Sequence, residues 1–417
     1  MFNEMMQINQ HVIVVGGGAS GMMAAITARK HGAKVTLLER NPRVGKKILA
    51  TGNGRCNYTN IKTDVCCYQG NNPQFAQEAL TLFDAAKTIE FFEKLGIAHK
   101  IEDLGKVFPR SDQASSVLDV LLYELQSLSV EILCDAYVVE IRKKKGSFIV
   151  KLKEGKTLYG DRVILTSGGK AMPSSGSDGN GYQLVQELGH TLTPIFPGLV
   201  QLKLSGNFFK QIEGVKFVGT AEVIQQEKGT AKDRGDILFG NYGVSGPPIL
   251  QISRKAGEML QKNQEAQLKL SIIDDLSKAH LTKLLTKRFR NSGAKTISFS
   301  LVGLINKRLI PVILKESGIK DLNVPAATIS LHEAEKIAGL LTDWRFMITG
   351  TKGWPHAQVT AGGINTQEID PESMESKIVP GLFFAGEIID IDGMCGGFNL
   401  QWAWSSGFVA GRQAAIQ

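Results

Sequence analysis

The stretch HVIVVGGGASG, residues 11–21, decides the fold of this 417-residue chain. Residues 11–15 are apolar and mostly β-branched, which is typical of a buried strand. A run of glycines breaks the strand, and the Ala-rich segment MMAAITARKHG that follows is typical of a helix ending near Gly32. The next segment, AKVTLLER, predicts a second buried strand that ends at Glu39. Strand, glycine turn, helix and strand in this order predict a Rossmann-type unit that binds a dinucleotide.

The glycines of this turn have separate predicted roles. Gly16 permits the tight turn, Gly18 lets the backbone approach a pyrophosphate, and Gly21 lets helix and strand pack closely. The start of the helix, at Ala19 and Ser20, supplies unpaired N–H groups and a positive dipole to the phosphates. Glu39 stands eighteen residues after Gly21, where a carboxylate accepts hydrogen bonds from ribose hydroxyls.

The segment after Glu39 favours FAD as the dinucleotide. An acid at this position disfavours a 2′-phosphate, which leaves FAD or NAD. A basic loop, NPRVGKKILA, leads into TGNGRCNYTN at residues 51–60. An NAD domain has no evident use for such a loop, whereas FAD needs contacts to its ribityl chain and ring. Gly52 and Gly54 permit close backbone approach, so we expect this backbone and the Asn53 side chain to line that part of FAD.

The C-terminal segment GLFFAGEIIDIDGMCGGFNLQWAWSSGFVAG, residues 381–411, carries a second nucleotide-binding signature. It begins with an apolar strand that ends at Gly386 and Glu387, and its helix begins near Phe398 after Gly396 and Gly397. Such a helix start stabilises the negative charge that a reduced flavin acquires. The two ends of the chain are therefore expected in one domain around one non-covalently bound FAD.

Six blocks of the sequence together resemble one known family. They are GGGASG, KKILATGNGRCNYTN, SGGKAMPSSGSDGNGY, NYGVSGPPILQ, VTAGGI and CGGFNLQWAWSSG, and they are similar to the BaiN-like (HI0933-type) family of FAD-dependent oxidoreductases. The resemblance covers nearly the whole chain and implies an α/β fold, a glutathione-reductase-like Rossmann FAD-binding domain interrupted by a β-rich and helical insert. One branch of the family is associated with the reduction of double bonds in oxidised bile acids. Where related flavoproteins read ATGG, this chain has TSGG at residues 166–169.

The residues expected at the cofactor follow from the motifs and from the family resemblance. For Val138 the resemblance is the only basis. They are Gly16, Gly18, Ala19, Ser20, Gly21, Glu39, Arg40, Lys47, Thr51, Gly52, Asn53, Gly54, Val138, Gly168, Gly386, Glu387, Gly396, Gly397, Phe398 and Asn399.

The pattern of strands and helices predicts the domain boundaries. Residues 1–191 and 353–417 are expected to form the FAD-binding domain, and residues 192–352 the insert. The insert is expected to be β-rich over 192–273 and helical over about 274–341. Because ligand sites favour domain interfaces, we expect the insert to form the substrate cleft.

Several motifs that the sequence lacks limit the possible location and partners of the protein. No run of about eighteen apolar residues predicts a membrane span, and the start MFNEMMQINQ lacks the features of a signal peptide. The five cysteines form no CxxC pair, which favours a reduced, cytoplasmic protein. The seven histidines are scattered, so no metal site is predicted. The sequence carries no signal for an oligomeric state.

Flavin chemistry with a small organic substrate is the predicted activity. A flavin transfers hydride at its N5, and the family resemblance implies a C=C or similar bond as the acceptor. NAD(P)H is expected as reductant only at a shared, transient site, because no second strand-linked GxGxxG is present. Three side chains are candidate catalytic groups: Arg55 to hold a substrate oxygen, His356 to donate a proton, and Tyr242 to face the cleft. An ordinary structural role is the alternative for each.

Two further interpretations belong to other classes of protein. The formal net charge is +8, and the basic runs RKKKG (142–146) and KRFR (287–290) would contact phosphates in an FAD-dependent RNA-modifying protein. A solvated basic face is the simpler interpretation of these runs, so a nucleic-acid partner is disfavoured. The other alternative is a flavin-binding sensor without turnover.

Overall fold

The computed structural model describes residues 10–416. The sequence predicts no signal peptide in the N-terminal segment. Residues 1–9 of that segment lie outside the described residues. The chain divides into two compact units. Unit 1 comprises Met1–Phe196 and Gln358–Gln417, and unit 2 comprises Pro197–Ala357.

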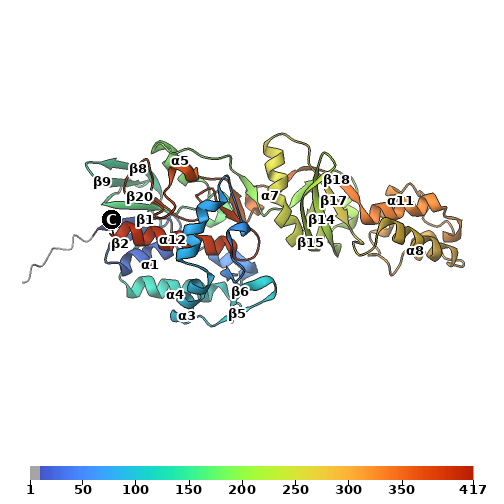
Figure 1. Ribbon diagram of the computed structural model, residues 1–417, viewed down its shortest axis with the longest axis horizontal. Helices are drawn as coiled ribbons and strands as arrows, with labels where there is room; N and C mark the ends of the chain where they lie inside the picture. Colours follow the sequence, from blue (N-terminus) through green and yellow to red (C-terminus); the bar gives the residue numbers. More distant parts are fainter. Residues whose placement is uncertain (1–9, 417) are drawn as a thin grey trace, which may run out of the picture. The chain divides into compact units, whose positions relative to one another are not determined.

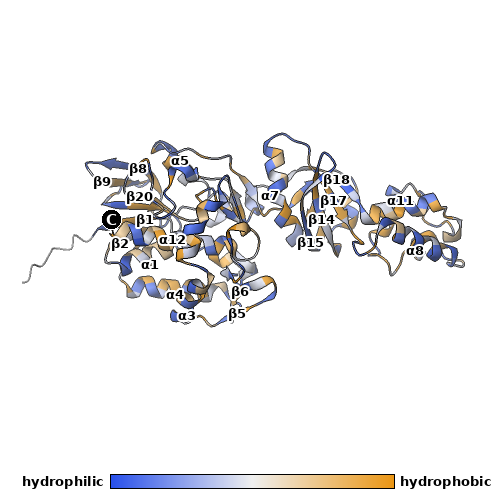
Figure 2. Cartoon of the chain, in the orientation of Figure 1, coloured by the Kyte–Doolittle hydropathy of each residue, from blue (hydrophilic) through white to orange (hydrophobic). Residues whose placement is uncertain are grey.

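Unit 1 is built on a five-stranded parallel sheet (Figure 1). Its strand order is β20 (Leu382–Phe384), β11 (Arg162–Leu165), β1 (His11–Val15), β2 (Lys34–Leu38) and β7 (Glu131–Leu133). Val12, Ile13 and Val14 in the central strand have no exposed surface, as expected of a parallel sheet that is covered on both faces. The apolar colouring of β1 contrasts in Figure 2 with the hydrophilic tip of the hairpin formed by β8 (Val138–Lys144) and β9 (Ser147–Leu152).

The helices of the two glycine motifs, α1 (Ala19–Lys30) and α12 (Phe398–Ile416), lie side by side (Figure 1). Two glycines of α12 allow this approach. A Cβ on Gly407 would stand 2.5 Å from the Ser20 carbonyl oxygen, and one on Gly411 would stand 2.3 Å from that of Ala24. The first and last helices of the described chain therefore belong to one core, as the two sequence signatures predict.

Smaller elements complete unit 1. They are the antiparallel sheet of β8 (Val138–Lys144), β9 (Ser147–Leu152) and β10 (Thr157–Gly160), the sheet of β3 (Thr59–Asn60), β6 (Lys106–Pro109) and β5 (His99–Ile101), the short pair β4 (Tyr68–Gln69) and β21 (Asp392–Gly393), and the helices α2 (Gln77–Leu82), α3 (Ala85–Lys94), α4 (Ala114–Ser127) and α5 (Asn180–Glu187).

Unit 2 contains a closed barrel of six strands. Their order is β13 (Leu202–Leu204), β16 (Gly243–Ser245), β15 (Lys228–Gly240), β14 (Lys216–Gln225), β17 (Gln267–Ser271) and β18 (Trp344–Thr351), and β18 pairs with β13 to close it. Closure leaves no unpaired sheet edge. An aromatic cluster that includes Phe208, Phe239 and Trp344 packs in the core of this unit.

Helices occupy the chain between β17 and β18. They are α8 (Lys278–Arg290), α9 (Ile297–Ser300), α10 (Ile310–Glu316) and α11 (Leu331–Thr342). A further helix, α7 (Pro247–Gln261), follows β16 and packs on β15. α8 and α11 lie against each other (Figure 1), and Leu281, Leu285 and Ile337 belong to the buried core of unit 2.

Candidate functional site

A large cavity opens in unit 1 where the central strands end. Val15, Leu38 and Thr166, at the carboxyl ends of β1, β2 and β11, lie in its wall. The cavity contains about 1250 Å³ of atom-free space, part of it open to solvent. The carboxyl edge of a parallel sheet is the usual place for a ligand in this class of fold.

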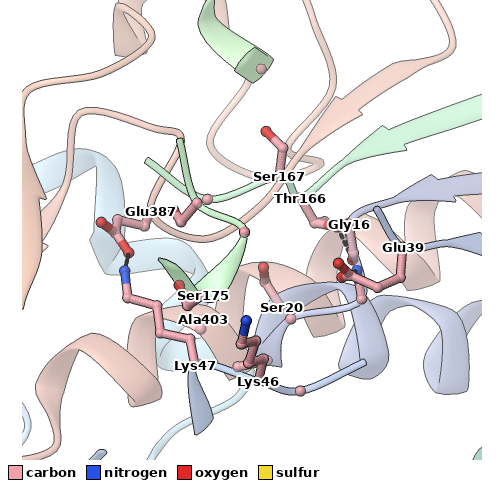
Figure 3. A pocket seen from close by; sticks show the side chains of 18 of the residues that line it. Gly16, Ser20, Glu39, Lys46, Lys47, Thr166, Ser167, Ser175, Glu387 and Ala403 are labelled. Atoms are coloured by element: carbon pink, nitrogen blue, oxygen red, sulfur yellow. Dashed lines mark hydrogen bonds and ion pairs between the residues drawn. The ribbon is translucent and has the colours of Figure 1, made fainter. Parts of the chain in front are cut away.

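The glycine turn after β1 forms one wall of this cavity (Figure 3). Gly16 has a φ of +112°, and a Cβ there would stand 2.5 Å from the Thr166 carbonyl oxygen. A Cβ on Gly21 would stand 1.9 Å from the Gly16 carbonyl oxygen, so this glycine is needed for helix–strand packing. A Cβ on Gly18 would meet nothing within 4 Å, because this residue borders open space. The three positions thus have the three geometries that the motif predicts.

The first turn of α1 is available to an anionic ligand. Gly18 is the N-cap residue, and no side chain caps the helix. The initial N–H groups of a helix have no partner within the helix and carry its positive dipole end. Because Gly18, Ala19 and Ser20 all line the cavity, a phosphate group fits this position.

Glu39 is fixed at the cavity wall by its neighbours. One carboxylate oxygen accepts a hydrogen bond from the Gly17 amide at 2.9 Å. The other accepts from the backbone and side-chain nitrogens of Asn41 at 2.8 and 2.7 Å. The residue is 8% exposed. A buried carboxylate held in this way is preorganised to accept hydrogen bonds from a polar ligand such as a ribose.

Besides Glu39, five charged side chains line the cavity, and four of them form ion pairs. The Lys47 ammonium lies 2.6 Å from the Glu387 carboxylate, and Figure 3 shows the two facing each other. Arg40 pairs with Asp178. Lys46 also lines the cavity but forms no ion pair within residues 10–416. This free ammonium complements an anionic ligand such as a pyrophosphate.

A buried hydroxyl in the same wall lacks a partner. The Oγ of Ser167 has no hydrogen-bond partner in the described part of the chain, although it is inaccessible to solvent. The adjacent Thr166 hydroxyl is satisfied, because it donates to the Val15 or Gly16 carbonyl at 3.0 or 2.8 Å. Leaving a buried polar group unpaired costs about 1–3 kcal/mol, so an orphan in a cavity wall indicates a missing ligand atom. The cavity therefore fits a dinucleotide.

Most of the sequence-predicted cofactor residues line this cavity. Those in its wall are Gly16, Gly18, Ala19, Ser20, Glu39, Arg40, Lys47, Thr51, Val138, Gly168, Glu387 and Asn399. Those outside its wall are Gly21, Gly52, Asn53, Gly54, Gly386, Gly396, Gly397 and Phe398.

Packing explains several residues of the second group. A Cβ on Gly386 would stand 2.5 Å from the Ser20 hydroxyl, and one on Gly397 would stand 2.5 Å from the Thr59 carbonyl oxygen. These two glycines bring backbone segments together behind the cavity. Gly52, Asn53 and Gly54 are instead exposed, so their contact with a cofactor stays a prediction.

The loop that contains those three residues has an unusual backbone. Gly52, Asn53, Gly54 and Cys56 all have positive φ angles, of 56°, 56°, 83° and 60°. A non-glycine residue in this region is uncommon and costs energy. Arg55, between them, ties the loop to the β6 region.

The Arg55 guanidinium is held by two carboxylates and an aromatic ring. Its Nε donates to Asp112 at 2.8 Å, its Nη2 pairs with Glu102, and the group stacks 4.1 Å from the Phe108 ring centroid. The Lys100 ammonium joins the same two carboxylates at 2.6 and 3.1 Å. This network positions the loop and leaves the predicted substrate role of Arg55 a prediction.

The other two catalytic candidates lie in unit 2 and do not line the cavity. His356 is exposed. Tyr242 is half-buried, and the Lys352 ammonium lies 4.4 Å from its ring centroid. Their roles in catalysis also stay predictions.

Several lining residues were not singled out from the sequence. Chief among them are Lys46, Ser167, Ser175, Asp178, Asn180 and Trp402. Ser175 to Asn180 belong to the SSGSDGNG stretch, whose glycines and small polar side chains were a usable signal. Trp402 lies in α12 and also lines the cavity. It is buried, and its indole donates to the Gly386 carbonyl at 3.1 Å.

Comparisons with known proteins agree with this geometry. The family model for the HI0933-like protein Rossmann domain matches residues 10–413. The chain is 40% identical to 3-dehydro-bile acid delta(4,6)-reductase of Clostridium scindens over 96% of this chain and 98% of that one. It is 32% identical to the ribosomal RNA dihydrouridine synthase of Escherichia coli over 94% and 95%.

A solved structure supports the fold alone. The 3-ketosteroid-delta4-(5alpha)-dehydrogenase of Rhodococcus jostii aligns over 99% of each chain with a TM-score of 0.50 and 16% identity. Together these comparisons confirm the predicted family resemblance, the α/β Rossmann architecture, and the class of the protein, an oxidoreductase with FAD as its cofactor. Over the described residues, no helix has the length and apolar character that a membrane span requires.

Proposed function

The chain belongs to the HI0933-like family, and we propose that it is a reductase that saturates a carbon–carbon double bond conjugated to a carbonyl group. Two relatives support this bond type. One is named as a delta(4,6)-reductase of 3-dehydro bile acids and the other as a dihydrouridine synthase. Both names describe saturation of a C=C bond in a molecule that carries a neighbouring carbonyl.

The observation that carries the proposal is the composition of the cavity wall. The uncapped start of α1 and the Lys46 ammonium would hold the pyrophosphate of FAD. Glu39 would hold a ribose, and the Ser167 hydroxyl would gain the partner that it lacks. Bound FAD supplies hydride transfer to the substrate.

In such a reduction the residues of the chain must polarise the substrate carbonyl and supply a proton to the substrate. A conjugated C=C bond accepts hydride at the carbon remote from the carbonyl, and a proton must then reach the carbon beside it. A donor must also stabilise the charge that develops on the carbonyl oxygen. Arg55, Tyr242 and His356 are our candidates for these tasks, and we propose that the inserted unit 2 supplies substrate-binding residues.

A paired set of substrates tests this function. The purified protein would be reduced anaerobically with NADH and NADPH in parallel, then mixed with a conjugated enone or with the saturated ketone of the same skeleton. We expect flavin reoxidation and a product two mass units heavier with the enone alone. Equal reoxidation by both compounds, or by neither, contradicts the proposal.

A second candidate function is reduction of uridine in RNA. The uracil C5=C6 bond is conjugated to a carbonyl, so the same chemistry applies, and one relative is named for ribosomal RNA. The specific observation in its favour is a run of basic residues without any acid at 276–315. Mass analysis of nucleosides from RNA treated with the enzyme and NAD(P)H tests it, because dihydrouridine must accumulate.

We further propose a cytoplasmic location. All five cysteines are free thiols in the described structure, which suits a reducing compartment. Labelling of these thiols in intact cells without prior reduction would support the location, and disulfide-linked Cys66 and Cys67 would contradict it.

A further inference from the structure

The net positive charge of the chain originates in one segment of unit 2. Residues 276–315 contain nine Lys and Arg and no Asp or Glu. The whole chain contains 48 basic and 40 acidic residues, so the residues outside this segment include 39 basic and 40 acidic ones. The excess of basic over acidic residues is therefore concentrated in this segment. This segment contains α8, α9 and most of α10.

A groove runs along this segment, and we name it the α8 groove. One side is the α8 face that carries His280, Lys283, Leu284 and Lys287, which the three- and four-residue spacing of a helix places together. Figure 2 shows α8 as a mixture of hydrophilic and hydrophobic residues. The lining continues through Asn291, Ser292, Lys295, Phe299, Ser300, Val302 and Leu304.

Three lysines of the α8 groove are unpaired. Lys283, Lys287 and Lys295 are exposed, and within residues 10–416 none of them forms an ion pair. No carboxylate lines the groove. Surface lysines that only solubilise a helix are commonly interspersed with acids, so this segregation points to an anionic partner.

Apolar side chains stand exposed beside these lysines. Phe299 is 59% exposed and Leu284 is 39% exposed, and both line the α8 groove. An exposed aromatic ring beside cationic side chains is the combination that binds unpaired nucleic acid, because bases stack on the ring while lysines contact phosphates. A vesicle surface uses the charges but has no planar group to stack on Phe299, and an acidic peptide has one only where it contains an aromatic residue.

The α8 groove is preformed. The Arg288 guanidinium donates to the carbonyl of Ser300 and, at 2.7 Å, to that of Val302, which fixes α8 to the opposite wall. The Ser292 hydroxyl, in the same lining, is buried and has no hydrogen-bond partner within the described residues. An unsatisfied polar group at this point is available to a ligand.

We propose that the α8 groove is a binding site for a single-stranded segment of RNA, with Lys283, Lys287 and Lys295 on phosphates and Phe299 under a base. The choice of RNA rests on the second function proposed above. The groove can bind a polyanion that carries bases whether or not the flavin reacts. RNA binding and RNA reduction can therefore each be disproved without the other.

Fluorescence anisotropy with a labelled RNA oligonucleotide of unpaired sequence tests this site on the full-length protein. The test variant is Lys283→Ala/Lys287→Ala/Lys295→Ala. Its matched control removes three exposed lysines of unit 1 that lie outside the basic run 142–146, Lys34, Lys151 and Lys156. Both variants lose the same charge, and the circular dichroism and thermal unfolding of each report its folding.

We expect the groove variant to bind RNA about tenfold more weakly or worse, and its salt slope to fall by about two, since each phosphate contact in a single strand contributes roughly 0.7. Phe299→Ala should weaken binding with an unchanged salt slope, because stacking is not ionic. The control should bind like the unaltered protein.

Three results would overturn the assignment. They are no RNA binding at ionic strength of about 0.1 M, an equal loss in the groove and control variants, or groove-dependent binding to vesicles of anionic phospholipid with none to RNA. If RNA binds in the α8 groove and no dihydrouridine forms, the site stands and the second candidate function fails.

Discussion

The Glu39 carboxylate accepts a hydrogen bond of 2.9 Å from the Gly17 amide, which joins the end of β2 to the glycine turn that follows β1. The contact spans 22 residues of sequence and lies in a buried site. The acid that is expected to bind a ribose therefore also holds the turn that is expected to bind the pyrophosphate. Changes at Glu39 should affect both parts of the cofactor.

Replacement of Glu39 gives the first prediction. Glu39→Gln should weaken FAD binding by about 1.5–3 kcal/mol, the scale of losing hydrogen bonds to a charged group. Titration of the apoprotein with FAD, followed by flavin fluorescence, measures this change. Glu222→Gln in the barrel of unit 2 is the control and should bind FAD normally. An unchanged dissociation constant for Glu39→Gln would show that the carboxylate does not contact the cofactor.

Gly18 and Gly21 provide a contrasting pair. Gly18 has a φ of −83°, which any residue adopts, and borders open space. Gly18→Ala should therefore leave the melting temperature of the apoprotein unchanged, while its methyl group lowers FAD affinity about tenfold, or ~1.4 kcal/mol. In Gly21→Ala the Cβ meets the Gly16 carbonyl at 1.9 Å, so the free energy of unfolding should fall by about 1–3 kcal/mol.

Thermal unfolding of the apoproteins and FAD titration separate these two effects. If Gly18→Ala binds FAD normally, the pyrophosphate does not pass over this residue, and the assignment of the cavity is wrong.

Gly54 tests the TGNGRC loop. We predict that Gly54→Val reduces FAD occupancy, whereas Arg55→Ala retains FAD and lowers reactivity. Because Gly54 has a φ of +83°, valine also strains the backbone, so Gly54→Asn is the matched control, since asparagine tolerates this conformation. The flavin-to-protein absorbance ratio of the purified variants is the measurement. Normal FAD occupancy in Gly54→Val would show that the loop does not contact the cofactor.

A buried histidine makes stability depend on pH. The His190 ring lies 3.0 Å from Glu368 and 2.8 Å from the Ser376 hydroxyl. Burial lowers the pKa of His190 below 6.5 despite the Glu368 carboxylate, which raises it. The unfolded state then binds more protons, so stability should be full above pH 6.5 and decline as the pH falls below it.

Glu368 adds to this acid lability at lower pH. Burial raises its pKa, but hydrogen bonds from Thr191 and His190 outweigh burial and hold the pKa below 4.5, so its contribution is lost as the pH falls through that region. Chemical unfolding between pH 7 and 5 should show a smaller decline for His190→Gln than for the unaltered protein. Parallel declines in the two proteins would contradict the assignment to His190.

The Rossmann unit could be derived from the sequence because its geometry is local. Gly16, Gly18 and Gly21 have distinct steric tasks that are fixed by spacing, and Glu39 must end the neighbouring strand. Residues such as Ser167 and Asp178 reach the same cavity only through long-range packing. Their approach depends on β11 pairing with β1, which no short pattern contains.

The loop TGNGRC, residues 51–56, is a case in which long-range contacts decide the geometry. TGNGRC has a composition suited to a cofactor, yet the structure shows Arg55 held by Asp112 and Glu102, and Gly52 to Gly54 outside the cavity wall. The partners of Arg55 are 47 and 57 residues away along the chain. Composition alone could not distinguish a loop that contacts a ligand from one that is braced beside it.

Reoxidation of the reduced protein measures the central claim most directly. The anaerobic protein would be reduced with one equivalent of dithionite, which removes any dependence on the natural donor, and its absorbance near 450 nm would be followed after mixing with a conjugated dienone. We predict that the flavin absorbance returns at a rate that saturates with dienone concentration, and that the recovered compound has gained two hydrogens. A flavin that stays reduced with every conjugated carbonyl compound tested, including uridine in RNA, would contradict the account.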